Sequence, residues 1–334
     1  MNITFENKKW IKDFLTTAKR YNWKNPIILS KGGDAFLICD PTLFQTIRFY
    51  IGTSSNDGVG KVIYSNLKNY VGMYDSLEVK EEEMSYTFPT IFDEYTLLPF
   101  QTIKDATAKL SVFPPKGKDH VDVSSYEVAY SYHIKLGNTS YIVGTNMASF
   151  GMVDLHISSS PVKTLLHKDL VKLYEEINRK YSRGNLRAYY SGNSSENFLS
   201  DELGILCIYS DADLRMPDWS RIIPIEDSET VGKINIREFG KLLSTIKVDK
   251  EDKDKSIQLG VGKTTMSASY NQMEITTWKH NKNCFPYFNS EYLQELCKTF
   301  SNKEVDFKFI PKTTSNYLFF EEPDYKAGIV GLAK

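Results

Sequence analysis

Gly262-Lys263-Thr264-Thr265 is the one stretch of this chain that resembles a nucleotide-binding motif. A phosphate-binding loop needs the pattern GxxxxGK[ST], because its glycines let backbone N–H groups surround the phosphates ahead of a helix. The first glycine of that pattern would fall at position 257, which is Ile257, and the residues after the stretch have the composition of a strand. The sequence therefore predicts a hairpin turn here and leaves a nucleotide-dependent enzyme as a distant alternative.

The other residues that could do chemistry are scattered. No two histidines stand at i, i+4 and none has a cysteine at metal-ligand spacing; they are His120, His133, His156, His167 and His280. The cysteines form no CxxC pair and are expected to be buried thiols in a reducing compartment; they are Cys39, Cys207, Cys284 and Cys297. Asp211 and Asp213 have no evident base beside them, and no GxSxG motif occurs. We therefore expect a protein that is not an enzyme, with no metal and no cofactor.

Length and charge narrow the class of protein. A chain of 334 residues suits two or three domains, and 41% hydrophobic with 25% charged residues is typical of globular proteins. The formal net charge of −1 argues against a protein that holds nucleic acid by a strongly basic surface alone. No apolar run reaches the length of a membrane span, and residues 1–9 lack the apolar core of a signal peptide. We expect a cytoplasmic protein that does not enter a membrane.

Six segments have apolar residues at the i, i+3, i+4, i+7 spacing of a helix with one buried side. The predicted buried positions are Trp10, Ile11, Phe14, Leu15 and Ala18; Ile63, Leu67, Tyr70 and Val71; Ile103, Thr107, Leu110 and Phe113; Leu170, Leu173, Tyr174 and Ile177; Ile236, Phe239, Leu242, Leu243 and Ile246; and Tyr292, Leu293, Leu296, Cys297 and Phe300.

Short strand-like runs follow these helices, most clearly at residues 26–51, 128–157 and 256–278, and turn residues separate them. One helix with three or four antiparallel strands, six times over, is a repeated α+β unit. We place domain boundaries near Leu98 and Pro224, which gives domains at residues 1–98, 99–224 and 225–334.

The connector at residues 211–224 carries the clearest signature. Pro217 and Pro224 stiffen it, and Trp219 gives it an apolar side chain that must pack on something. Met216-Pro-Asp-Trp-Ser-Arg-Ile-Ile-Pro224 resembles the segment Phe-Pro-Asp-Tyr-x-Arg-Val-Ile-Pro of the bacterial DNA polymerase III β subunit, the DNA sliding clamp. In that family the segment closes the second domain and leads into the third.

Further stretches extend this resemblance over most of the chain. Thr145-Asn-Met-Ala-Ser-Phe150 occupies the place of the family's Thr-Asp-Gly-His-Arg-Leu turn, and Phe288-Asn-Ser-Glu-Tyr-Leu293 is similar to the start of its last helix. Asn25-Pro-Ile-Ile-Leu29 and the tail from Tyr317 to Lys334 also resemble family segments. The resemblance implies a divergent member with the α+β DNA clamp fold, and the abundance of Asn, Lys and Tyr would suit an AT-rich genome such as that of a phage.

The resemblance implies a ring of two head-to-tail subunits, a homodimer, that encircles duplex DNA without regard to sequence and acts as a polymerase processivity factor. Basic residues on the solvent sides of the helices would face the duplex. The candidates are Lys8, Lys12, Lys19, Arg20, Lys104, Lys109, Lys168, Lys172, Arg179, Lys180, Arg237 and Lys241.

The resemblance also implies a hydrophobic cleft between the second and third domains, into which DNA polymerase and clamp loader insert short peptide motifs. The matching positions are Thr145, Phe150, Pro217, Arg221, Ile222, Ile329, Val330 and Leu332. Met147-Ala148-Ser149 replaces the family's Gly-His-Arg, and the family's closing Met-Pro-Met-Arg-Leu has become Val330-Gly-Leu-Ala-Lys334, so an altered partner preference is expected. The main alternative is a non-catalytic scaffold that has the clamp fold but binds other protein partners.

Overall fold

The structure is a computed structural model and describes residues 1–40, 45–83, 95–115, 129–181, 185–189, 196–201, 204–211, 217, 219, 232–246, 248, 251, 255–261, 266–270, 273–276, 287–311 and 316–332. The chain forms two compact units. Unit 1 comprises Met1–Asp105, Ser131–Ser140 and His156–Met216, and unit 2 comprises Ala106–Tyr130, Tyr141–Leu155 and Pro217–Lys334. The predicted division into three domains is a different partition of the chain and stays a prediction.

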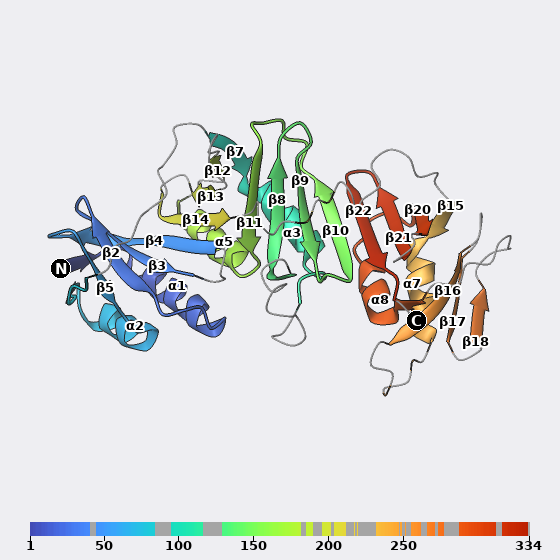
Figure 1. The fold of residues 1–334 in the computed structure, drawn as a ribbon, viewed down its shortest axis with the longest axis horizontal. Coiled ribbons are helices and arrows are strands. Elements are labelled where there is room, and N and C mark those ends of the chain that lie inside the picture. The colour runs from blue at the N-terminus through green and yellow to red at the C-terminus, as the bar shows by residue number, and fades with distance from the viewer. Residues whose placement is uncertain are drawn as a thin grey trace. The chain divides into compact units, whose positions relative to one another are not determined.

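Unit 1 is built on one large antiparallel sheet (Figure 1). Its strands run in the order β5-β2-β3-β4-β14-β13-β12-β7, and β1 pairs with both β4 and β6. Their bounds are β1 Asn2–Phe5, β2 Ile27–Lys31, β3 Asp34–Cys39, β4 Gln45–Ser54, β5 Gly58–Lys61, β6 Ser76–Glu78, β7 Tyr95–Pro99, β12 Asn185–Tyr189, β13 Glu196–Asp201 and β14 Leu206–Asp211. Strands β8, Ser131–Leu136, and β11, Val162–His167, form a further antiparallel pair in this unit.

Helices α1, Lys8–Arg20, α2, Tyr64–Met73, and α5, Leu170–Tyr181, belong to unit 1, together with the first part of α3, Phe100–Leu110. All five positions predicted to be buried on α1 are buried. Phe14 of α1 stacks on Phe49 of β4 with ring centroids 4.6 Å apart. Because both rings are fully buried, each contributes about 1.5–3 kcal/mol of hydrophobic stabilisation to this helix–sheet contact.

The buried side of α2 differs from the predicted one. Leu67 and Val71 are buried as expected, but Ile63 precedes the helix and is 54% exposed, and Tyr70 is only half-buried. Tyr64 fills the buried position instead, and its hydroxyl donates a hydrogen bond to the carbonyl oxygen of Lys24. A helix of ten residues can satisfy the helical spacing in two registers, and this one turns a less hydrophobic side toward the core.

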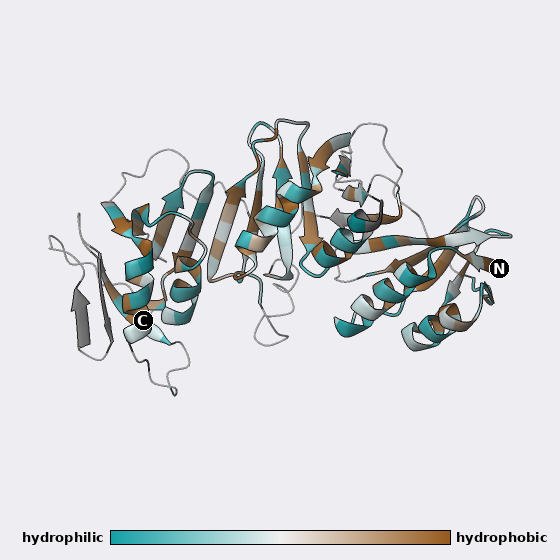
Figure 2. Cartoon of the chain, turned by 180° about the vertical axis from the view of Figure 1, so that it is seen from behind, coloured by the Kyte–Doolittle hydropathy of each residue, from teal (hydrophilic) through white to brown (hydrophobic). Residues whose placement is uncertain are grey.

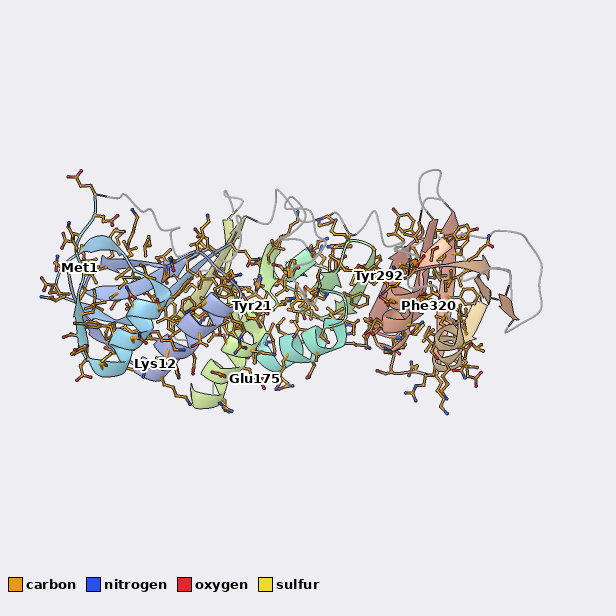
Figure 3. All side chains as sticks on the ribbon, turned by 90° about the horizontal axis from the view of Figure 1, so that it is seen from below. Met1, Lys12, Tyr21, Glu175, Tyr292 and Phe320 are labelled. Carbon is orange, nitrogen blue, oxygen red and sulfur yellow. The ribbon has the colours of Figure 1, made fainter. Side chains whose placement is uncertain are left out.

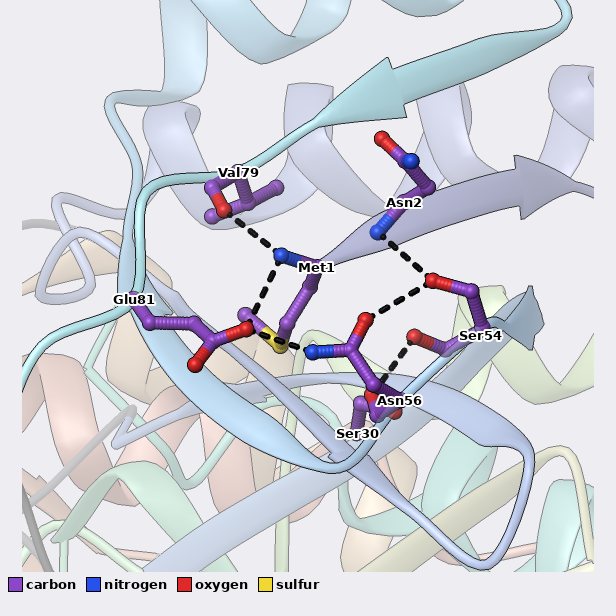
Figure 4. A network of polar contacts seen from close by, with 8 residues as sticks. Met1, Asn2, Ser30, Ser54, Asn56, Val79 and Glu81 are labelled. Atoms are coloured by element: carbon purple, nitrogen blue, oxygen red, sulfur yellow. Dashed lines mark hydrogen bonds and ion pairs between the residues drawn. The ribbon is translucent and has the colours of Figure 1, made fainter.

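The start of the chain is tied into unit 1 by a polar network (Figure 4). The ammonium group of Met1 donates to the carbonyl oxygen of Val79 at 3.0 Å and to Oε1 of Glu81 at 3.1 Å. Asn56 donates its amide N–H to the same Oε1 atom, and the Ser30 hydroxyl donates to the carbonyl oxygen of Asn56. The hydrogen bonds from the ammonium group and from Asn56 lower the pKa of Glu81.

In unit 2, six consecutive antiparallel strands run in the order β9-β10-β22-β21-β20-β15. They are β9 Tyr141–Thr145, β10 Ser149–Asp154, β22 Tyr325–Val330, β21 Asn316–Glu322, β20 Glu304–Pro311 and β15 Gly232–Asn235. A second sheet has the order β18-β17-β16-β19, with β18 Met273–Thr276, β17 Met266–Tyr270, β16 Ser256–Val261 and β19 Tyr287–Asn289. The stretch Gly262–Thr265, once compared with a phosphate-binding loop, lies outside the described residues, and the predicted strand after it is confirmed as β17.

Two helices of unit 2 begin with an asparagine cap. The side chain of Asn235 accepts the backbone N–H of Glu238 at the start of α7, Ile236–Thr245, and that of Asn289 accepts the N–H of Tyr292 in α8, Ser290–Cys297. Among the predicted buried positions, Phe239 and Leu293 are buried, whereas Tyr292 is 38% exposed and was wrongly assigned to the core. Figure 2 shows the helices with hydrophilic residues on their outer sides and hydrophobic residues toward the strands.

The two sheets explain why the compact units cross the predicted domain boundaries. Strand β4, before Leu98, pairs with β14, after it, and strand β10, before Pro224, pairs with β22. Backbone hydrogen bonds therefore join segments on both sides of each boundary. The predicted six α+β segments are present, and their strands form shared sheets.

Candidate functional site

The predicted DNA-facing residues of unit 1 lie on helices α1, α3 and α5 or just before α5. We call the sides of α1, α2, α3 and α5 that point away from the strands the helix face; Figure 3 shows Lys12 and Glu175 there. Lys19, Arg20, Lys172 and Arg179 are exposed. Lys8, Lys12, Lys104 and Lys168 are half-buried, and the side chain of Lys180 lies outside the described residues.

Several of these cations have carboxylate partners within the chain. Lys8 contacts Asp75, which follows α2, and Nζ of Lys104 lies 2.6 Å from Oε1 of Glu175 in α5. Burial lowers the pKa of Lys168, and the neighbouring Asp169 partly opposes this effect. The helix face of unit 1 is thus a mixture of exposed cations and ion-paired cations.

In unit 2, the predicted DNA-facing residues differ in their surroundings. Arg237 and Lys241 are exposed on α7, and Arg237 donates to the carbonyl oxygen of Ser301 at 3.1 Å. Lys109, near the end of α3, has its Nζ 2.5 Å from Oε1 of Glu322 and 4.1 Å from the ring centroid of Tyr325. The carboxylate also accepts the backbone N–H groups of residues 301 and 302. Burial alone would raise the pKa of Glu322, but these hydrogen bonds outweigh burial and lower it.

The predicted peptide-cleft residues that the structure describes come together in unit 2. Phe150 of β10 pairs with Thr145 of β9 on one side and with Gly328 of β22 on the other. Ile329 lies opposite Ser149, and the backbone N–H of Val330 donates to the carbonyl oxygen of Ala148.

The remaining cleft positions lie at the ends of this group. Leu332 donates its backbone N–H to Tyr287 at 2.7 Å, and Pro217 is half-buried. Arg221 and Ile222 lie outside the described residues. Thr145, Phe150 and Ile329 are almost fully buried, so any contact surface here would be formed by the half-buried Pro217, Val330 and Leu332.

Trp219 belongs to this group although it was not among the predicted site residues. Its ring centroid lies 5.4 Å from that of Phe150, which in turn lies 5.8 Å from the ring of Phe319. Trp219 is 4% exposed. Its position in a stiff connector was the signal that could have added it, because a tryptophan there must find an apolar partner.

The turn between β9 and β10 has a fixed geometry. The Asn146 side chain accepts the backbone N–H groups of Ala148 and Ser149, and the Thr145 hydroxyl accepts the N–H of Met147. Met147 has φ 74°, a left-handed conformation that glycine adopts more easily. The side chain of Met147 is consequently held outward and is 49% exposed.

Two features of unit 1 were not foreseen from the sequence. A cavity of about 630 Å³ lies against α2, and the residues lining it are Asn25, Pro26, Ile27, Lys61, Val62, Ile63, Asn66, Leu67, Tyr70 and Leu77. His167 and Asp169 form a buried pair with Nδ1 and Oδ2 3.4 Å apart, next to the ring of Trp23. Within the described ranges, no three His, Cys, Asp or Glu side chains are grouped so that they could hold a metal ion. No helix in the part of the chain that the structure describes is both long and apolar enough to cross a membrane.

No protein-family model matches this chain, and no match was found among curated proteins. Solved structures do match it over its whole length. A putative DNA polymerase III β subunit from Eubacterium rectale covers 99% of this chain and 99% of its own, with a TM-score of 0.66 at 12% identity. The β subunit from Thermotoga maritima covers 100% of this chain and 99% of its own, with a TM-score of 0.65 at 14% identity.

A DNA polymerase III β sliding clamp from Bartonella birtlesii, solved bound to griselimycin, covers 100% of both chains with a TM-score of 0.63 at 14% identity. The match spans every element described above, and the mixed α+β architecture with antiparallel sheets agrees with it. The chain has the DNA clamp fold of the DNA polymerase III β subunits.

Proposed function

We propose that this protein is a DNA sliding clamp, a processivity factor that closes as a ring of two subunits around duplex DNA in the cytoplasm. The observation that supports this most strongly is the whole-chain match to solved β subunits, with no domain missing from the alignment. In this proposal the chain contributes three domains, at residues 1–98, 99–224 and 225–334, and has no catalytic activity of its own.

Exposed cations on the helices support a DNA-facing role. Lys19 and Lys172 in unit 1 and Lys241 in unit 2 are on solvent-facing sides of α1, α5 and α7. Contacts of lysine and arginine with phosphates are independent of sequence. Weak contacts suffice when the ring itself keeps the duplex in place, which fits a net charge of only −1.

The group around Phe150 is the proposed docking site for partner peptides, which would come from a DNA polymerase and a clamp loader. Half-buried apolar side chains from the tail and from Pro217 suit hydrophobic anchors of a short peptide. The altered turn at Met147-Ala148-Ser149 would change which peptides bind. A P217A/I222A double variant should lose affinity for the polymerase from the same source, measured by calorimetry, and normal binding would place the docking site elsewhere.

Solution mass and retention on DNA test the ring. Light scattering should give a species of twice the 38.3 kDa chain mass over a range of concentrations. The purified protein, incubated with its clamp loader and nicked circular plasmid, should remain on the circle during gel filtration and leave it after the plasmid is linearised. Equal retention on circular and linear DNA would contradict sliding.

A scaffold that binds other protein partners is the second candidate. It is favoured by the carboxylates that neutralise Lys8, Lys104 and Lys109 within the chain. A monomer at all concentrations, together with no retention on circular DNA, would support the scaffold.

A further inference from the structure

Two of the lysines on the helix face are held by carboxylates from a neighbouring helical segment. Lys8 is the first residue of α1, and Asp75 follows the end of α2. Lys104 lies in α3, and Glu175 lies in α5. The same arrangement therefore occurs twice in unit 1, once between α1 and α2 and once between α3 and α5.

Both carboxylates face solvent. The side chain of Asp75 is 91% exposed and that of Glu175 is 48% exposed, and Figure 3 shows Glu175 on the side of α5 that points away from the strands. An ion pair in such a position adds little to the stability of a protein. Stability therefore does not explain why a carboxylate lies beside a lysine at these two places.

The carboxylates do change how a phosphate group would be received. A DNA phosphate that approaches Lys104 must first replace the Glu175 carboxylate, and afterwards it lies near a negative charge that has lost its partner. The same holds for Lys8 and Asp75. Exposed lysines such as Lys19 and Lys172 have their charge directed to solvent and can attract the duplex at longer range.

We propose that Asp75 and Glu175 are counter-charges that lower the affinity of the helix face for duplex DNA, by holding Lys8 and Lys104 in ion pairs that phosphates must break. This inference rests on the proposed DNA-encircling function. Its consequence is that the duplex is held by fewer phosphate contacts than the number of lysines on the helix face suggests, which favours movement along DNA over tight binding.

The test uses the full chain and a fluorescein-labelled duplex, with binding followed by fluorescence anisotropy over a series of salt concentrations. The variants are Asp75→Asn, Glu175→Gln and the two combined. Each single change should tighten binding about two- to fivefold and make the slope of log K against log salt steeper by about 0.9.

Glu321→Gln is the matched control, because it removes the same charge from a different face. Glu321 is ion-paired with Lys308 and Lys326 on strands β20 and β22. The preceding residue, Phe320, packs on Phe239 of α7, so Glu321 points to the side of the sheet away from the helices. The control should bind DNA like the wild type.

The outcomes separate the inference from the function on which it rests. Wild-type binding that is unchanged in Asp75→Asn and Glu175→Gln overturns the inference and leaves the proposed function intact. An equal gain in Glu321→Gln also overturns it, because net charge would then be the cause. Absence of DNA binding in the wild type and in every variant overturns both. Tighter binding and a steeper salt slope confined to the helix-face variants support the inference.

Discussion

The Nδ1 atom of His167 lies 3.4 Å from the Oδ2 atom of Asp169, and both side chains are buried in unit 1. Nδ1 accepts the backbone N–H of Asp169, so a neutral imidazole carries its proton on Nε2 and turns a lone pair toward the carboxyl group. Oδ2 has no hydrogen-bond partner among the described residues. The two groups therefore meet acceptor to acceptor unless one of them gains a proton.

Burial acts on both members of this pair. It lowers the pKa of His167 to about 3, with the charge of Lys168 acting in the same direction. It raises the pKa of Asp169 to about 6, against the opposing charges of Lys168, Lys172 and Arg20. Tyr21 donates a hydrogen bond to Asp169, which also opposes the rise. Both groups consequently favour their neutral forms in the folded protein.

The first prediction concerns acid stability. His167 has a depressed pKa in the folded state, so its contribution is present above the unfolded value of about 6.5 and is lost as the pH falls toward 3. In His167→Gln this loss disappears. The free energy of unfolding of this variant, relative to wild type, should rise by up to about 1.4 kcal/mol per pH unit below pH 6.5. Urea unfolding between pH 7.5 and pH 4.5 measures the difference.

Asp169→Asn should behave in the opposite way. A raised folded pKa means that wild type gains stability as the pH falls through about 6 toward the unfolded value. The stability of Asp169→Asn relative to wild type should therefore be highest at pH 7.5 and decrease on acidification. A pH-independent difference for both variants would show that the pair does not titrate in this range.

The second prediction concerns the turn before β10. Met147 has φ 74°, which costs a residue with a side chain about 1 kcal/mol or more. Met147→Gly should therefore stabilise the protein by about 1 kcal/mol, measured by chemical unfolding. Ala148→Gly, one residue on, should destabilise it by roughly 0.5–1 kcal/mol, because glycine there only adds freedom to the unfolded chain. Equal effects at the two positions would contradict the conformational explanation.

The third prediction concerns the packing of α3 on β10. A Cβ atom added at Gly151 would come within 2.4 Å of the Phe113 ring and 2.7 Å of Leu110, both buried. Gly151→Ala should destabilise unit 2 by about 2 kcal/mol or more, through displaced core side chains. Gly72→Ala in α2 is the comparison, because the new Cβ would meet only the flexible end of Lys12 at 3.4 Å. That variant should gain roughly 0.5–1 kcal/mol from helix propensity.

The fourth prediction concerns Lys109 and Glu322. Lys109→Gln leaves a carboxylate whose side chain is 3% exposed without its cation, and this should cost about 3 kcal/mol. The double variant K109Q/E322Q should recover part of the loss, because neutral amides need no counter-charge. Lys12→Gln should stay within about 0.5 kcal/mol of wild type. Thermal unfolding of the four proteins compares them, and an additive double variant would show that the two residues do not interact.

Helical periodicity found the helices well and their exact faces less well. On α1 the five apolar positions define one register, and all are buried. On α2 the apolar residues fit two registers, and the choice of Tyr64 over Ile63 depends on a hydrogen bond to the carbonyl of Lys24, far away in the sequence. Spacing within a segment does not contain that information.

The candidate sites were foreseen only in part, for a similar reason. Resemblance in short stretches located Thr145, Phe150 and Ile329, which the structure places on adjacent strands. Ion pairs such as Lys104 with Glu175 join residues distant in sequence, and so does the contact of Tyr21 and Trp23 with His167. These relationships arise from strand pairing between distant segments, which a single sequence does not reveal.

Strand β22 lies between β10 and β21, so its backbone completes the hydrogen-bonding of a strand made much earlier in the chain. During synthesis, one edge of β10 stays without this partner until the ribosome has produced nearly all of the chain. Pairing over such a separation is slow, and an unpaired strand edge can join another chain. Polysomes making this protein therefore place several incomplete sheets close together, and chaperones that shield strand edges should increase its yield.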